Sequence, residues 1–227
     1  HMQMQLTGDR GAGLALDAIA VSNPDSGPHR LTHCYLVDPQ DRPRFTSLGA
    51  VADFQLAPSS YEQSFRSLST ELIGATRTSQ LLPALQVYQE NALMTLSSDW
   101  DADTLSPLVK IKIALTLAGF PDVATVLPLM TKNPSELLHT NTGTLEVGKL
   151  ADIIALDQNI FEIPKESIDE TKVVFTMLGG EIIYDPSGIG GDIISPAPTP
   201  TPPSASAKAS LAISVWALLG ALMIGWW

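Results

Sequence analysis

The stretch Gly143-Thr-Leu-Glu-Val-Gly-Lys-Leu-Ala-Asp-Ile-Ile-Ala-Leu-Asp157 marks a change of pattern in this 227-residue chain. Residues 151–156 within it are a short apolar run typical of a β-strand, and similar runs follow at residues 173–178 and 181–184. Gly179 and Gly180 join the last two runs, and a Gly-Gly pair between apolar runs predicts a tight hairpin. The region from residue 143 to 184 is therefore expected to form a small β layer.

Upstream of this stretch, apolar runs alternate with helix-like segments as far as about residue 130. The runs expected to form strands are residues 2–6, 30–35, 50–55 and 93–97. The segments expected to form helices are residues 12–20, a stretch from Asp38-Pro39 to near Gly49, and residues 107–118, whereas a long loop is expected around Pro58. This alternation indicates an α/β fold built from β/α units with a parallel sheet.

The region after residue 186 changes character twice. Residues 187–210 are expected to be a linker, because their second half is rich in Pro, Ser, Ala and Thr and predicts an extended spacer. Residues 211–227 follow without a charge, and a helix of that length would reach about 26 Å, close to the thickness of a bilayer core. We expect this tail to be a membrane anchor or a signal for a glycosylphosphatidylinositol anchor, the alternative being an apolar extension without a function.

Composition excludes one class of partner. The formal net charge is −11, and only 13 lysines and arginines are available to neutralise phosphates, so no nucleic-acid partner is expected. Cys34 is the only cysteine in the chain, which rules out an intrachain disulfide and a cysteine-based zinc site. Its expected role is that of a small buried residue.

Polar residues stand at the ends of the four predicted strands. They are Gln5, His33, Gln55 and Asp99. In β/α folds the carboxyl ends of parallel strands form the reactive face, so these residues are expected to gather there. His33 and Asp99 are of the types that bind a divalent metal and activate water. Each alone could equally be a polar group that closes a strand.

The pattern of these segments resembles a known family. The matching runs are Gly8-Asp9-Arg10, Leu16-Asp17-Ala18, His29-Arg30-Leu31-Thr32-His33, Leu36-Val37-Asp38-Pro39 and Ser97-Ser98-Asp99-Trp100, together with residues 143–157. They are similar to the C-terminal half of the metal-dependent amidohydrolases, in the branch called amidohydrolase family 3 that includes formamide deformylase-like proteins. The resemblance covers residues 2–186.

The resemblance implies a fold. Residues 1–135 would be the last four β/α units of a (β/α)8 TIM-type barrel, and residues 136–186 a segment of the small β-sandwich that accompanies it. Residues 2–6 would then be the fifth barrel strand, with the first four strands absent. Half a barrel leaves open sheet edges, so self-association is expected.

The resemblance also implies site residues. His33 matches the metal-binding histidine of the sixth strand, and Asp99 matches the catalytic aspartate of the eighth strand, which also binds metal. Gln5 stands where the fifth strand carries a histidine, and an amide oxygen is a poorer ligand for a transition metal than imidazole. The cofactor expected is a divalent metal, zinc in the first place.

Two functions remain open from the sequence. One is a hydrolase that uses metal-activated water on the carbon–nitrogen bond of a small amide or cyclic amide, incomplete in this chain and inactive as a fragment alone. The other is a non-catalytic binding or scaffold domain at a membrane surface, or an inactive truncated product. The tail suggests attachment to a membrane or the cell surface, and without it the protein would be cytoplasmic.

Overall fold

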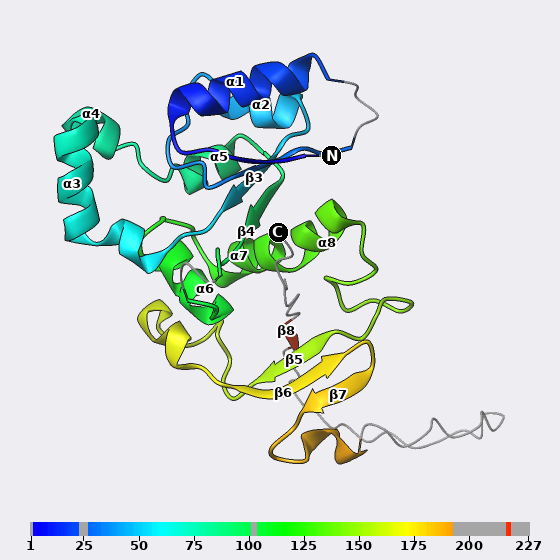
Figure 1. The fold of residues 1–227 in the computed structure, drawn as a ribbon. Helices are drawn as coiled ribbons and strands as arrows, with labels where there is room; N and C mark the ends of the chain where they lie inside the picture. Colours follow the sequence, from blue (N-terminus) through cyan, green and yellow to red (C-terminus); the bar gives the residue numbers. More distant parts are fainter. Residues whose placement is uncertain (1, 23–26, 101–103, 193–216, 219–227) are drawn as a thin grey trace.

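The computed structural model describes residues 2–22, 27–100, 104–192 and 217–218. Two sheets organise these residues, a parallel one surrounded by helices and an antiparallel one that lies apart from it (Figure 1). The α/β class and the parallel sheet predicted from the sequence are confirmed. Closure of the parallel sheet into part of a barrel stays a prediction.

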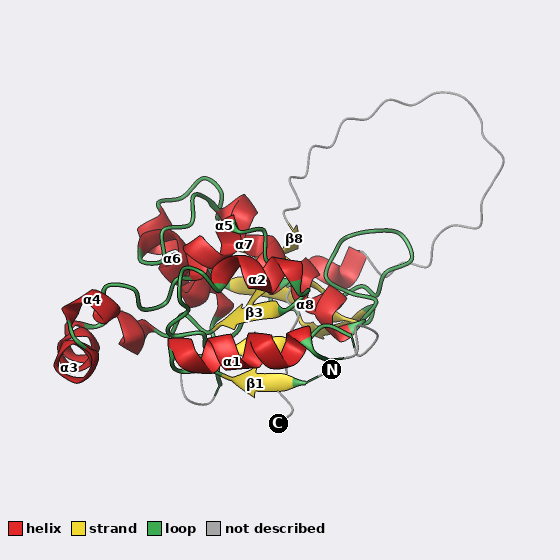
Figure 2. Ribbon diagram, turned by 90° about the horizontal axis from the view of Figure 1, so that it is seen from above, coloured by secondary structure: helices red, strands yellow, loops and turns green. Residues whose placement is uncertain are grey.

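The parallel sheet has four strands whose spatial order follows the chain. They are β1 (Gln3–Gln5), β2 (Arg30–Thr32), β3 (Val51–Phe54) and β4 (Met94–Leu96), each inside a run predicted as a strand. Gln5 pairs with Thr32, Thr32 with Asp53 and Asp53 with Thr95, so these four residues form one row across the sheet. All four carboxyl ends therefore meet at one edge (Figure 2).

One face of the parallel sheet is apolar and the other is polar. Leu31, Ala52 and Met94 lie in one row across the sheet and are fully buried in the main core. The neighbouring row of Thr32, Asp53 and Thr95 points to the other face, because side chains alternate along a strand. The polar row is exposed at Gln5 on β1 and buried at Asp53 and Thr95.

Helices cover the apolar face. α1 (Asp9–Ala20) contributes Ala12, Leu16 and Ile19 to the core, and Phe45 of α2 (Arg42–Ser47) lies in the same cluster. α2 begins three residues later than expected, at Arg42, because Asp38 closes a turn by accepting a hydrogen bond from the Gln40 amide at 3.0 Å. The helical prediction was therefore right in type and wrong at its start.

The loop expected around Pro58 is largely helical, which corrects that prediction. It contains the 3-10 turn η2 (Pro58–Tyr61) and the helices α3 (Gln63–Ile73), α4 (Ala75–Thr78) and α5 (Ala84–Gln89). No residue of α3 is buried, and Figure 1 shows α3 and α4 projecting from the rest of the molecule. Phe65, Leu68 and Leu72 recur at helical spacing along α3, so the sequence held a helical signal here even though Leu68 and Leu72 are exposed.

Three helices follow β4. They are α6 (Pro107–Thr116), α7 (Val123–Met130) and α8 (Lys132–Leu138). Asp122 caps α7 by accepting a hydrogen bond from the Thr125 amide at 2.8 Å, and this contact lowers the pKa of the Asp122 carboxyl. The predicted boundary between residues 135 and 136 falls inside α8 and stays a prediction.

The antiparallel sheet has the order β7-β6-β5-β8. Its strands are β5 (Ile153–Leu156), β6 (Val173–Leu178), β7 (Glu181–Tyr184) and β8 (Ala217–Leu218). Gly179 and Gly180 both have positive φ, so the predicted Gly-Gly hairpin between β6 and β7 is confirmed. The 3-10 turn η3 (Lys165–Glu170) packs on α6 and joins it through the Lys112–Asp169 ion pair at 2.8 Å.

The C-terminal predictions fall mostly outside the described residues. The described chain ends with the 3-10 turn η4 (Ile189–Asp192) and resumes only at β8, whose two residues pair with β5. Within the described ranges, every helix is too short or too polar to cross a membrane. The linker at 187–210 and the anchor at 211–227 stay predictions.

Candidate functional site

The carboxyl edge of the parallel sheet carries the residues singled out from the sequence. Gln5 is the last residue of β1, His33 follows β2, and Gln55 follows β3. Asp99 lies in the loop after β4. His33 and Asp99 have left-handed backbones, with φ of 69° and 54°. Non-glycine residues in this region are uncommon and cluster at functional sites, so the edge has a feature typical of such sites.

His33 is partly buried beside an aromatic side chain. Its ring stacks on the ring of Tyr35, with 5.8 Å between the centroids and an interplanar angle of 19°. Tyr35 in turn contacts Phe65 of α3, with the ring centroids 6.1 Å apart. The Nδ1 atom of His33 is buried and has no hydrogen-bond partner in the described part of the chain.

Gln5 and Asp99 differ from His33 in their surroundings. Both are exposed to solvent, and so is Trp100, with 67% of its surface accessible. Asp99 is therefore a free-standing carboxylate at the rim of the sheet. Such a group can accept a proton from water or from a ligand.

The residues present do not by themselves fit a metal ion. Among the described residues, no group of three or more His, Cys, Asp or Glu side chains is placed to hold one. A catalytic zinc takes three protein ligands, whereas His33 and Asp99 are two, and Gln5 brings only an amide. The predicted ligands are thus at one edge without forming a complete site.

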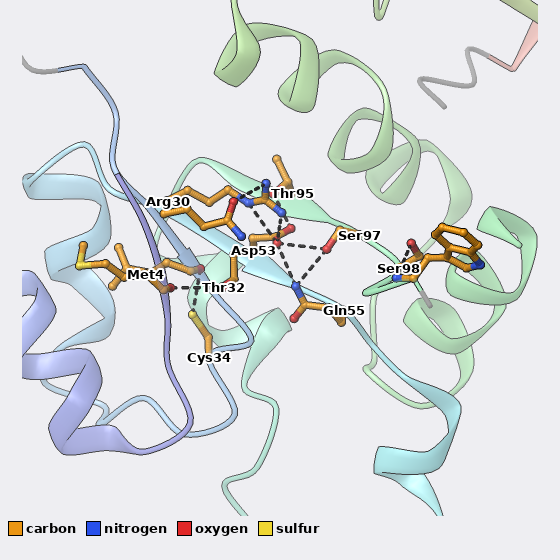
Figure 3. Close-up of polar contacts among 12 residues, drawn as sticks. Met4, Arg30, Thr32, Cys34, Asp53, Gln55, Thr95, Ser97 and Ser98 are labelled. Atoms are coloured by element: carbon orange, nitrogen blue, oxygen red, sulfur yellow. Dashed lines mark hydrogen bonds and ion pairs between the residues drawn. The ribbon is translucent and has the colours of Figure 1, made fainter. Parts of the chain in front are cut away.

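The best-connected polar group of the sheet is Asp53, which the sequence reading missed. Its side chain is fully buried in the middle of the polar face (Figure 3). Four side chains bond to its carboxylate: Arg30 Nη2 to Oδ2 at 2.6 Å, Thr95 Oγ1 to Oδ1 at 2.7 Å, Gln55 Nε2 to Oδ2 at 3.0 Å, and Ser97 Oγ to Oδ2 at 3.1 Å. We call Arg30, Asp53, Gln55, Thr95 and Ser97 the Asp53 cluster.

A signal for the Asp53 cluster was present in the sequence. Each predicted strand holds a polar, an apolar and a second polar residue in turn: Gln3-Met4-Gln5, Arg30-Leu31-Thr32, Asp53-Phe54-Gln55 and Thr95-Leu96-Ser97. Such alternation over neighbouring strands predicts one wholly polar face. The prediction considered only the residues at the strand ends and therefore missed this polar face.

Cys34 is a packed residue without a reactive thiol, as expected. It is fully buried, and its Sγ donates to the Leu31 carbonyl at 3.3 Å. Burial, with a smaller contribution from the negative charge of Asp53, strongly raises the pKa of the Cys34 thiol. A thiol that stays protonated is a poor nucleophile.

His29 and His139 have no motif partner in the sequence, which predicts surface positions for both, but His29 is buried, with 5% of its surface accessible. Its Nδ1 accepts a hydrogen bond from the Met2 amide at 3.2 Å, and its Nε2 lies 3.4 Å from the Ser22 hydroxyl. His29 therefore ties β1 to the loop after α1. His139 is exposed, as expected.

Two surface cavities are lined by residues other than the predicted site residues. One of about 440 Å³ is lined by α8 and the loop from His139 to Lys149, and another of about 430 Å³ is lined by α1 and residues 38–44. Neither is lined by His33, Gln55 or Asp99.

Comparison with known proteins gives a family match over most of the chain. The model of the amidohydrolase family matches residues 2–184. Among individual proteins, Protein LONG AFTER FAR-RED 3 of Arabidopsis thaliana is 26% identical over 197 residues, which is 78% of this chain and 33% of that protein. The chain therefore spans about a third of the length of that relative.

Solved structures share the fold at low sequence identity. The A. niger ochratoxinase has a TM-score of 0.62 and 18% identity, over 82% of this chain and 42% of that one. A Xaa-Pro dipeptidase with bound methionine in the active site has a TM-score of 0.57 and 17% identity, over 80% of this chain and 44% of that one. A metal-dependent hydrolase from Pyrococcus furiosus has a TM-score of 0.52 and 20% identity, over 65% of this chain and 31% of that one. In each case the match leaves more than half of the solved chain uncovered.

Proposed function

We propose that this chain, which belongs to the amidohydrolase family, takes part in hydrolysing a carbon–nitrogen bond other than a peptide bond. The substrate would be a small amide or cyclic amide. The observation that carries the proposal is the placement of His33 and Asp99 just beyond β2 and β4, at one edge of a parallel sheet, with backbones in the left-handed region.

The chemistry proposed for Asp99 is that of a general base. Its exposed carboxylate would take a proton from the attacking water as the carbon–oxygen bond forms. The same carboxyl would return that proton to the nitrogen as the carbon–nitrogen bond breaks. His33, whose ring stacks on Tyr35, would contact the substrate at the same edge through its unpaired Nδ1.

A divalent metal, with zinc as the first choice, would need ligands beyond His33 and Asp99. Among the described residues, no group of three or more His, Cys, Asp or Glu side chains is placed to hold such an ion. We therefore place no metal-dependent step on this chain alone.

A second function is supported by Gln5. This residue holds the position at which the family resemblance implies a histidine, and its amide is exposed on the edge strand β1. A chain without that imidazole could bind a small amide without hydrolysing it. The membrane attachment foreseen for such a binding domain rests on residues 211–227, which lie almost entirely outside the described residues.

One experiment separates these functions. The full chain is assayed with a panel of small amides and lactams, with and without added zinc, beside Asp99→Asn and Gln5→His. Zinc-dependent hydrolysis that falls by at least about a hundredfold in Asp99→Asn supports the hydrolase, since a general base contributes about 10² to 10⁴ in rate. Absence of hydrolysis in the wild-type chain, with zinc retained only by Gln5→His, supports the binding function instead.

A further inference from the structure

Gln55 is held in one orientation by the Asp53 cluster. Its Nε2 atom donates to Asp53 Oδ2 at 3.0 Å and to Ser97 Oγ at 3.0 Å. An ionised carboxylate can only accept hydrogen bonds, and Asp53 is the ion-pair partner of Arg30 at 2.6 Å. The side of the carboxamide that faces Asp53 must therefore be the NH₂ group, which settles the assignment of the two amide atoms.

The other side of the carboxamide is an acceptor without a donor. Gln55 is only 7% exposed, and its Oε1 atom is buried with no hydrogen-bond partner in the described part of the chain. Figure 3 shows this oxygen directed away from both Asp53 and Ser97. A buried acceptor left unpaired costs about 1–3 kcal/mol, so folded proteins rarely keep one without a use.

The unpaired oxygen belongs to the carboxyl edge of the sheet, which is the edge that would receive a substrate under the proposed function. Gln55 directly follows β3, which lies between the strands that carry His33 and Asp99 at their ends. The buried Nδ1 atom of His33 is likewise unpaired, on the strand next to β3. Two unpaired polar atoms thus follow neighbouring strands at one edge of the sheet.

We propose that Gln55 Oε1 accepts a hydrogen bond from an N–H group of the bound substrate. The inference rests on the proposed function and narrows its substrate class. A ligand of this site carries an N–H on its carbonyl group, as a primary amide, a secondary amide or a lactam does. Esters lack that donor and would place an oxygen against Gln55 Oε1.

A pair of probes with nearly the same shape tests this selectivity. N-methylbenzamide carries an N–H group at the position where methyl benzoate carries its ester oxygen. Binding of each to the full wild-type chain is measured by ligand-observed NMR, so that no turnover is needed. The expected result is at least about tenfold tighter binding of the amide, which corresponds to one hydrogen bond lost and one acceptor left unpaired. Equal binding of the two probes, or binding of neither, overturns the proposal.

Two variants locate the source of the selectivity. Gln55→Met removes the acceptor, and the amide and the ester should then bind within about twofold of each other. Thr95→Val is the matched control, because it removes a different bond to Asp53 and leaves Gln55 Oε1 in place. Selectivity that persists in Gln55→Met, or that disappears equally in Thr95→Val, contradicts the assignment. Selective binding without any hydrolysis would support this inference while removing the hydrolase function.

Discussion

Buried polar atoms are hydrogen-bonded in the middle of the parallel sheet and partly unpaired at its carboxyl edge. In the middle, Asp53 is fully buried and bonded by four side chains at 2.6–3.1 Å. At the edge, the buried atoms His33 Nδ1 and Gln55 Oε1 have no hydrogen-bond partner in the described part of the chain. Tyr61 Oη, in the turn η2 that follows β3, is unpaired in the same way.

This difference separates stability from binding. A buried polar atom that is bonded within the chain helps to hold strands together and has little capacity left for a ligand. A buried polar group without a partner adds nothing to stability and keeps its capacity free. Substitutions in the Asp53 cluster should therefore lower the free energy of unfolding more than substitutions at the edge, whereas substitutions at the edge should have the larger effect on binding.

The largest effect is expected when the central ion pair is broken. Arg30→Met leaves the buried Asp53 carboxylate without its cation and should lower the free energy of unfolding by about 3–5 kcal/mol. Urea unfolding followed by circular dichroism measures this change. Arg44→Met is the control, because Arg44 pairs with Asp17 and Asp41 near the surface, and its loss should cost about 1 kcal/mol. Equal losses in the two variants would remove the special role of the middle of the sheet.

The sequence was informative about this sheet as far as local pattern reaches. All four strands and the hairpin at Gly179-Gly180 lie where they were predicted, because period-two apolar runs and glycine pairs are local signals. α3 was missed although Phe65, Leu68 and Leu72 recur at helical spacing, because the Pro58 turn η2 that precedes it is itself a local loop signal. The start of α2 was misplaced because Asp38 forms a turn and Asp41 stands next to the helix.

The candidate site was predictable in position but not in its bonding. Gln5, His33, Gln55 and Asp99 were recognised at the strand ends, since strand direction alone brings them to one edge. The contacts of Asp53 depend on the register of three strands. Its partners Arg30 and Thr95 lie 23 and 42 residues away from it in the sequence. His29 was misassigned for the same reason, because its partner Met2 lies 27 residues away.

The next effect comes from removing one bond of the Asp53 cluster. Thr95→Val keeps the shape of the side chain but deletes the 2.7 Å bond to Asp53 Oδ1, and should cost about 1.5–3 kcal/mol of unfolding free energy. Thr70→Val on the exposed face of α3 is the control and should change stability by less than about 0.5 kcal/mol. Thermal unfolding of both variants tests the difference, and a Thr95→Val variant as stable as the control would show that the cluster is not a stabilising network.

A smaller change in stability is expected at the edge. His33→Asn and Asp99→Asn introduce asparagine, which tolerates the positive φ at both positions. His33 Nδ1 has no hydrogen-bond partner in the described part of the chain, so His33→Asn breaks no bond at that atom. Each variant should stay within about 1 kcal/mol of the wild-type free energy of unfolding. The binding of N-methylbenzamide should weaken in His33→Asn at the same time. A loss of stability as large as that of Thr95→Val would place the edge in the same class as the middle.

The smallest effect at neutral pH is expected at Tyr61. Its hydroxyl is buried and unpaired, so Tyr61→Phe removes a desolvated group without breaking a bond and should be neutral or stabilising by up to about 1 kcal/mol. Burial raises the pKa of Tyr61 from 10.0 to about 12, against a smaller opposing effect of the Arg66 charge. The folded state therefore holds the phenol proton more tightly than the unfolded state does.

The raised pKa of Tyr61 predicts how the stabilities of wild type and Tyr61→Phe differ in alkaline solution. The stabilisation from a raised pKa is complete below the unfolded value of 10.0 and is lost as the pH rises towards about 12. Wild-type protein should thus lose stability across this window faster than Tyr61→Phe, whereas Tyr184→Phe, on the exposed hairpin strand β7, should follow the wild type. Unfolding free energies measured at several pH values decide the matter. Parallel curves for wild type and Tyr61→Phe would mean that the Tyr61 hydroxyl is not desolvated in the folded state, and Tyr61 would then not belong with the buried unpaired groups beside this sheet.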